Sequence, residues 1–172
     1  FEWNTSGVFA ASGNTYFPNA AAGTTPIFRI TAVTGTPGGG SNTLINGLTQ
    51  VNANFTWAAG AGNKTFRDGI CGSAIMTVPA TMTGTFNVGI APPTGTASII
   101  LGGINLRIVM DRPMNIADNI TVTVPIDSLV TVSSTNGSNI SKGATSNFVV
   151  DGLADMTPVS ISNTSGAVSI NG

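Results

Sequence analysis

The 172-residue sequence contains no histidine, and this absence removes most of the familiar catalytic chemistry. Histidine is the usual general base near neutral pH, a common metal ligand and the base of Ser–His and Cys–His nucleophile pairs. A glycosidase needs two facing carboxylates, but aspartates near glycine or proline are more typical of turns. Asp151 and Asp155 offer too few oxygens for Ca²⁺, and Gly38-Gly39-Gly40 lacks the Lys-Ser/Thr of a P-loop. We therefore predict a protein that is not an enzyme, with no catalytic residue, cofactor or metal site.

Charged residues are also scarce. They make up 8% of the chain, against about 25% in an ordinary soluble domain, and the net charge is −1. The six basic residues are scattered along the sequence, so no patch could neutralise a run of phosphates, and nucleic-acid binding is not expected. A surface so close to neutral gives little protection against association. Self-association and simple solubilisation by hydroxyls and amides both remain open.

Cysteine and long apolar runs are nearly absent. Cys71 is the only cysteine, which excludes an internal disulfide, and we predict it to be a small buried hydrophobe. The longest aliphatic run, 99–101, is far shorter than the ~20 residues of a membrane span. The first residue is Phe1 rather than methionine, which predicts a secreted, extracellular protein whose signal peptide has been removed. A trimmed chain would look the same.

What the sequence does contain is apolar alternation of period two, the pattern of half-buried strands. Val51, Ala53, Phe55 and Trp57 alternate with polar residues and predict one buried face, with Trp57 in the core. Similar alternation covers the ranges 86–90, 106–110, 120–124 and 168–170. The segment 111–119 could hold a single helical turn.

Turn residues separate these strands. Asn46-Gly47 and Asn136-Gly137 are typical of tight hairpins, and no internal repeat is visible. Strand patterns recur every 8–14 residues without a helix-sized segment between them. We therefore predict an all-β fold: a single antiparallel β-sandwich, Ig-like or jelly-roll, with an N-terminal extension strand. The predicted division is a donor strand and linker at 1–25 and the sandwich domain at 26–172.

The N-terminal segment 1–10 is apolar with a single charge. It could be the first strand of its own sandwich, or an extension that completes the sheet of a neighbouring subunit. For the second alternative, an extended strand places five residues on one face: Phe1, Trp3, Thr5, Gly7 and Phe9. These are the predicted subunit-interface residues, with Trp3 and Phe9 as anchors.

In size, composition, its first residue and the segment Trp3-Asn4-Thr5-Ser6-Gly7, the chain resembles a major subunit of an extracellular fimbrial or pilus filament with Ig-like domains. Many chaperone–usher subunits carry a disulfide and an aromatic residue near the C-terminus, and this chain has neither. The resemblance implies polymerisation by strand donation into the next subunit, a role in adhesion or biofilm, and no catalytic site. The implied partners are copies of the chain itself, together with host-surface or matrix glycans.

Seven Asn-X-Ser/Thr triplets are candidate N-glycosylation sites in a glycosylating host. They begin at Asn4, Asn54, Asn63, Asn119, Asn136, Asn139 and Asn163. The abundance of Asn, Ser and Thr accounts for much of this number.

Two other functions fit the same composition. One is a viral capsid, tail or decoration protein with a jelly-roll fold, and the other is a monomeric carbohydrate-binding adhesin domain. Native polymers, particles or monomers would separate the three.

Overall fold

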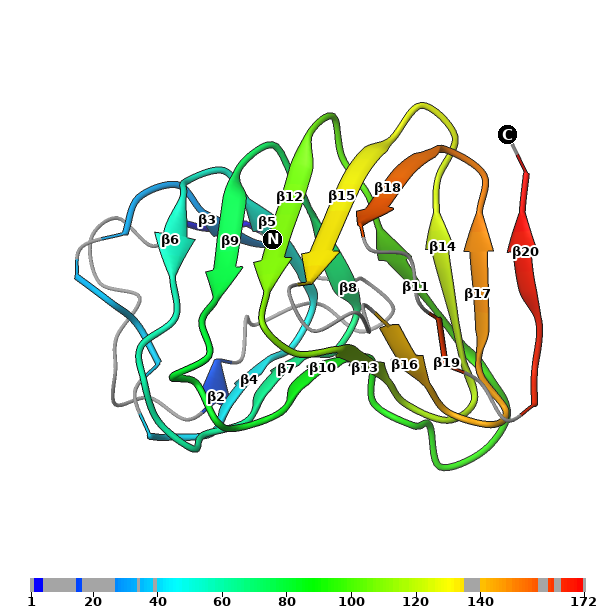
Figure 1. Cartoon of the computed structure of the whole chain (residues 1–172), viewed down its shortest axis with the longest axis horizontal. Helices are drawn as coiled ribbons and strands as arrows, with labels where there is room; N and C mark the ends of the chain where they lie inside the picture. Colours follow the sequence, from blue (N-terminus) through cyan, green and yellow to red (C-terminus); the bar gives the residue numbers. More distant parts are fainter. Residues whose placement is uncertain are drawn as a thin grey trace.

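The computed structural model describes residues 2–4, 15–16, 27–33, 35–38, 40–134, 140–157, 161–162 and 165–171, and these form a β-solenoid (Figure 1). Each strand pair among them is parallel. The chain passes repeatedly through three sheets, A, C and then B, and completes five coils between β5 and β19. In Figure 1 the strands of sheet C run downward and those of sheet A upward, with the short strands of sheet B at the bottom.

The three sheets have these members in spatial order. Sheet A holds β1 (Glu2–Asn4), β3 (Ile27–Ile30), β5 (Leu48–Val51), β8 (Gly69–Gly72), β11 (Ala97–Leu101), β14 (Ile120–Val124), β17 (Asn147–Val150) and β20 (Val168–Ile170). Sheet C holds β6 (Phe55–Thr56), β9 (Ile75–Val78), β12 (Leu106–Met110), β15 (Leu129–Ser134) and β18 (Leu153–Thr157). Sheet B holds β2 (Thr15–Tyr16), β4 (Thr43–Ile45), β7 (Lys64–Phe66), β10 (Phe86–Val88), β13 (Met114–Ile116), β16 (Ile140–Lys142) and β19 (Ile161–Ser162).

The core follows from the alternation seen in the sequence. In β14, Ile120, Val122 and Val124 point inward and are completely buried, while the threonines between them face outward. Trp57 is 1% exposed, which confirms its predicted place in the core. Because paired residues of successive coils point the same way, inward residues form columns that run the length of the solenoid.

The predicted antiparallel sandwich is wrong. Alternation of period two shows which residues face a core, but it does not show which strand lies alongside. In the first coils, paired residues lie 21 positions apart, as with Ile27 and Leu48 or Phe55 and Met76. That interval contains three strands, whereas a hairpin pairs strands that follow one another directly.

The turn residues have a different role from the predicted one. Asn46-Gly47 forms the corner between β4 and β5 rather than a hairpin. The Gly47 amide donates a hydrogen bond of 2.8 Å to Asp68 Oδ2, one coil further on. Asn136-Gly137 lies outside the described residues. The segment 111–119, considered for a helical turn, contains strand β13 instead.

Donor-strand exchange also has to be corrected. Strand β1 pairs in parallel with β3 of its own chain, with Trp3 opposite Phe28. Strand β2 likewise pairs with β4, so both strands from 1–25 belong to sheets of the solenoid. Phe1, Thr5, Gly7 and Phe9 lie outside the described residues. A parallel solenoid has no sandwich groove of the kind that a donated strand would fill.

Candidate functional site

Short polar side chains at the corners tie each coil to its neighbour. Asn42 Oδ1 accepts a hydrogen bond of 2.9 Å from the Asn63 amide, and Asn63 Oδ1 accepts one of 2.9 Å from the Thr85 amide. At another corner, Asn54 Oδ1 accepts one of 2.8 Å from the Ile75 amide. These bonds satisfy backbone donors that turn away from the sheets, which explains why a solenoid uses so many asparagines.

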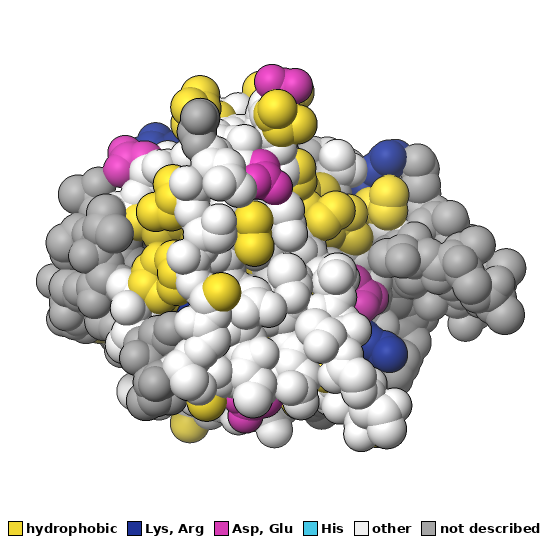
Figure 2. Space-filling model, turned by 90° about the vertical axis from the view of Figure 1, so that its right-hand side faces the viewer, with side chains coloured by type: hydrophobic (Ala, Val, Ile, Leu, Met, Phe, Trp, Pro, Cys, Tyr) yellow, Lys and Arg dark blue, Asp and Glu magenta, His cyan; other side chains and the backbone are white. Residues whose placement is uncertain are grey.

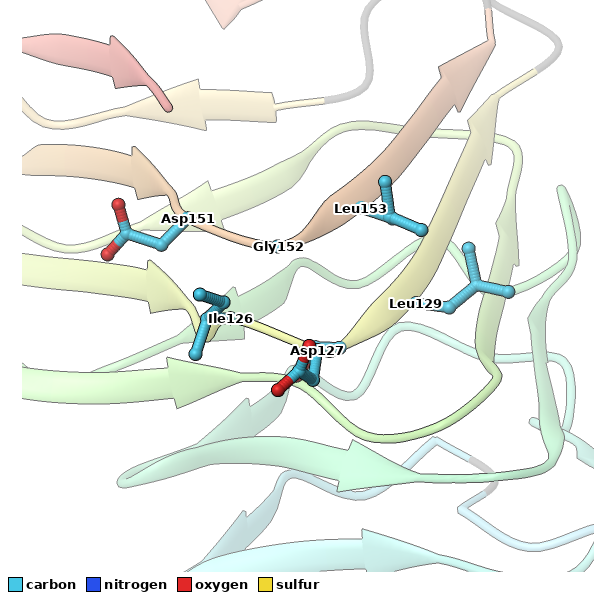
Figure 3. A pocket seen from close by; sticks show the side chains of 7 residues that line it. Ile126, Asp127, Leu129, Asp151, Gly152 and Leu153 are labelled. Atoms are coloured by element: carbon cyan, nitrogen blue, oxygen red, sulfur yellow. The ribbon is translucent and has the colours of Figure 1, made fainter. Parts of the chain in front are cut away.

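A groove opens at the corner where the chain passes from sheet A to sheet C, in the last two coils (Figure 3). Its volume is about 480 Å³, and it is lined by Ile126, Asp127, Ser128, Leu129, Asp151, Gly152 and Leu153. Figure 3 shows Leu129 and Leu153 on neighbouring strands at one side, and Ile126, Asp127 and Asp151 at the other. The groove is therefore amphipathic, with two leucines at one side and two carboxylates next to an isoleucine at the other.

Backbone hydrogen bonds fix the shape of this corner. The Ser128 amide donates a hydrogen bond of 3.1 Å to the Pro125 carbonyl. This bond closes a turn in which Asp127 has a φ of 64°. Aspartate tolerates this left-handed conformation better than most residues. Gly152 lies where an added Cβ would collide with the Pro125 carbonyl, so only glycine lets the two coils approach here. The leucines and carboxylates are thus carried on a rigid frame.

The two carboxylates differ in their surroundings. Asp151 Oδ1 accepts a hydrogen bond of 2.9 Å from Asn171 Nδ2. Asp127 is exposed and has no hydrogen bond or ion pair with a described residue. Ile126 and Leu153 are 75% and 69% exposed, an unusual amount of apolar surface beside two charges. The arrangement suits a ligand with an apolar face and hydroxyl or ammonium donors.

A second groove of about 400 Å³ lies at the corner between sheets B and A. The loop after β10 contributes Ile90, Pro92 and Pro93 to its lining, and the corner after β7 contributes Arg67 and Asp68. Ile90 was predicted to be buried with Phe86 and Val88, but it is exposed because the chain has already left β10. This groove carries both signs of charge.

Two lysines, which sequence reasoning left unassigned, are buried inside the solenoid. Lys64 Nζ donates to the carbonyls of Gly38 at 2.9 Å and Ser41 at 2.7 Å. Lys142 Nζ donates to the carbonyls of Ser165 at 2.9 Å and Gly143 at 3.1 Å. Burial lowers the pKa of both lysines from 10.5, and nearby Asp118 partly offsets this for Lys142. Each ammonium group satisfies loop carbonyls near one end of the core.

Cys71 differs from its prediction as a buried hydrophobe. It is half-buried on the outer face of sheet A, in register with Gln50 and one strand further from Arg29. Burial raises the pKa of its thiol, while the Arg29 charge acts in the opposite direction. The thiol is therefore mostly protonated near neutral pH.

The candidate glycosylation sites remain predictions. Asn54 and Asn63 are exposed, yet their side chains take part in the corner bonds described above. Asn119 is half-buried at a φ of 58°, and Asn4 lies in β1. Asn136, Asn139 and Asn163 lie outside the described residues.

In the part of the chain that the structure describes, no three His, Cys, Asp or Glu residues come together as metal ligands. The same residues form no apolar helix of membrane-spanning length. Comparison with protein-family models, with curated proteins and with solved structures found no match to this chain.

Proposed function

We propose that this chain is a structural β-solenoid module of an extracellular surface assembly, acting as a rigid spacer and scaffold. The observation that carries this proposal is the uninterrupted core. The buried aliphatic and aromatic residues form one continuous cluster, from Phe28 to Met156, that runs through the five stacked coils. A stack of this kind resists bending because each coil is bonded to the next along three sheets.

The polar corner bonds support the same proposal. They join residues 20–27 positions apart and repeat from the Asn42 corner to the Asn147 corner. A module of this type keeps its outer surface hydrated with hydroxyls and amides, in agreement with the low charge content.

Electron microscopy of native material tests the proposal. We expect the chain in extended assemblies in the extracellular fraction, detected with an antibody against the folded domain. A chain found only as a dispersed monomer inside cells would overturn it. Finding the chain in regular viral particles would also overturn it and would show that the chain is a component of a virus particle.

A second function, glycan binding, is favoured by the groove at the A–C corner. Sugar rings present an apolar face and hydroxyl donors, which the leucines and Asp127 could contact together. Glycan screening with wild-type protein and the Asp127→Asn and Leu153→Ser variants tests this. Binding that both substitutions weaken supports the site, and binding that neither changes excludes this groove.

A further inference from the structure

The second groove, of about 400 Å³ and called the B–A groove below, exists because one corner is longer than its counterparts. The chain passes from sheet B to sheet A through two residues at 46–47 and through two again at 67–68. Between β10 and β11 the same passage takes eight residues, 89–96. The longer loop contributes one wall of the groove, beside the two short corners. Further coils of the solenoid flank these corners on both sides.

The wall is apolar and preformed. Ile90, Pro92 and Pro93 line the groove, and Ile90 is 41% exposed. Both prolines have a φ that is fixed by the ring, so this part of the loop loses little conformational freedom when a ligand binds. The Gly89 amide donates a hydrogen bond of 2.8 Å to the Phe66 carbonyl, which ties the start of the loop to the preceding coil. A ligand therefore meets an aliphatic surface that is already in place.

Arg67 and Asp68 form the polar side of the groove. Asp68 Oδ2 is occupied, since it accepts the hydrogen bond of 2.8 Å from the Gly47 amide. Asp68 Oδ1 lies 3.9 Å from Arg67 Nε, and Arg67 Nη1 donates a hydrogen bond of 3.4 Å to Asn46 Oδ1. Among the described residues these are the only contacts of the guanidinium, and the Arg67 side chain is 55% exposed. Most of its five N–H groups and one oxygen of Asp68 therefore remain available to a ligand, because an exposed ion pair at this distance is weak.

The two grooves differ in charge. Figure 2 looks onto the C-terminal end of the solenoid and shows acidic groups among the hydrophobic side chains of its upper half, toward the A–C corner. The lining of the A–C groove contains two aspartates and no basic residue. The lining of the B–A groove instead brings one basic and one acidic side chain together. The charges of the B–A groove therefore match a ligand that carries both signs.

We propose that the B–A groove binds a free α-amino acid with an apolar side chain. The α-carboxylate accepts hydrogen bonds from Arg67, the α-ammonium donates one to Asp68 Oδ1, and the side chain packs on Ile90, Pro92 and Pro93. An apolar anion would leave Asp68 without a partner, and an apolar cation would leave Arg67 without one. The groove has the volume of a small-molecule site. This binding goes beyond the structural role and does not depend on it.

Titration of isotope-labelled protein with matched compounds, followed by NMR, tests the proposal. L-phenylalanine should shift the amide signals of Gly47, Asp68 and Ala91, with a dissociation constant of about 1 mM for a ligand of this size. N-acetylphenylalanine lacks the ammonium group and phenylalaninamide lacks the carboxylate, so each should bind about 5-fold more weakly. Glycine has both charges but no side chain, and it should leave these signals unchanged.

Variants assign each contact. Asp68→Asn keeps an oxygen for the Gly47 amide but removes the charge, so it should bind phenylalanine and N-acetylphenylalanine with equal affinity. Arg67→Gln should likewise lose the difference between phenylalanine and phenylalaninamide. The matched control is Arg107→Gln, at an exposed arginine of β12 in sheet C, and it should bind phenylalanine like wild type.

Phenylalanine that leaves the signals of the groove unchanged, or that binds wild type and both groove variants equally, would overturn the site. Blocked derivatives that bind wild type as tightly as phenylalanine would overturn the assignment of the ligand. If Asp68→Asn loses its β-sheet circular dichroism, Ile90→Ser takes its place, because it removes apolar surface from the loop and should weaken phenylalanine binding. None of these results changes the extended assemblies that test the structural function, so the two proposals can fail separately.

Discussion

The apolar core is covered to different extents near the two ends of the solenoid. At the N-terminal end, Trp57 packs edge-on against Phe55 and Phe66 at centroid distances of 5.4 and 6.2 Å, and Lys64 lies 5.4 Å above its ring. Gly38 contacts the ring so closely that any side chain there would collide with it. At the C-terminal end, Val168 and Ile170 of sheet A pair in register with buried Phe148 and Val150 but are themselves 40% and 72% exposed.

The comparison shows that an end coil buries its inner surface only where other residues pack on it. Aromatic bulk and the segment 35–38 provide this cover at one end. At the other end Lys142 donates hydrogen bonds to the carbonyls of Gly143 and Ser165, and Val168 and Ile170 stay exposed. We therefore expect apolar residues at the N-terminal end to contribute more to stability than those of β20.

The largest contrast should come from truncating an apolar residue at each end. Trp57→Ala should lower the free energy of unfolding by about 3–5 kcal/mol, because it opens a large cavity beneath Gly38. Ile170→Ala should change it by less than about 0.5 kcal/mol in monomeric protein. Urea denaturation at low protein concentration measures both. Similar losses at the two ends would show that β20 is covered in solution.

The two buried lysines offer a comparison that depends on pH. Lys64→Met should cost about 1–3 kcal/mol at neutral pH, because the carbonyls of Gly38 and Ser41 lose their donor. The folded-state pKa of Lys64 is lowered, so the unfolded state binds more protons between that pKa and 10.5. The stability that wild type gains from Lys64 should therefore rise with pH in this window and fall as pH decreases through the lowered pKa.

Unfolding free energies of wild type and Lys64→Met from pH 7 to 10.5 test this, since the titration of Cys71 is common to both and cancels in the difference. Lys142→Met should show a smaller rise, because Asp118 opposes the shift. A difference that stays constant across the range would mean that Lys64 is well hydrated.

The hydrogen bonds at the corners should each contribute less to the free energy of unfolding than a large buried side chain of the core. Asn63→Ala removes the acceptor for the Thr85 amide and should cost about 0.5–1.5 kcal/mol in unglycosylated protein. Asn147→Ala, which removes the acceptor for the Ala167 amide, is its counterpart near the C-terminal end. The control is Asn105→Ala, at an exposed asparagine whose side chain has no hydrogen bond to a described residue. Equal melting temperatures for the three variants would show that the corner hydrogen bonds do not contribute to stability.

The smallest predicted effect is a gain in stability. Thr49 is fully buried, and its hydroxyl has no hydrogen-bond partner among the described residues. Thr49→Val keeps the shape and should stabilise the N-terminal coils by up to about 1 kcal/mol. Ser146→Ala should lower the stability, because it removes a hydroxyl that donates a hydrogen bond of 2.8 Å to the Gly143 carbonyl. Calorimetric melting temperatures that move in the same direction would contradict this pair of predictions.

Part of the A–C corner groove could be anticipated from the sequence. The acidic pair Asp151 and Asp155 was visible, and so was the turn character of the residues around it. The groove instead joins Asp151 to Asp127 and Leu129, residues of a neighbouring coil, while Asp155 lies on the outer face of sheet C. Which residues meet across coils depends on a coil length that varies from 20 to 32 positions, and no fixed period reveals it.

Local sequence patterns predicted that the protein is built of short strands and, within a strand, which side chains share a face. Alternation in the segment 120–124 and the apolar setting of Trp57 reflect local chemistry, since a strand always turns alternate side chains to opposite faces. Tertiary structure alone decided that the strands lie parallel and that Asn46-Gly47 forms a corner. Pairing joins residues far apart in the chain, and the same turn residue serves a hairpin or a solenoid corner depending on which partner strand completes its hydrogen bonds.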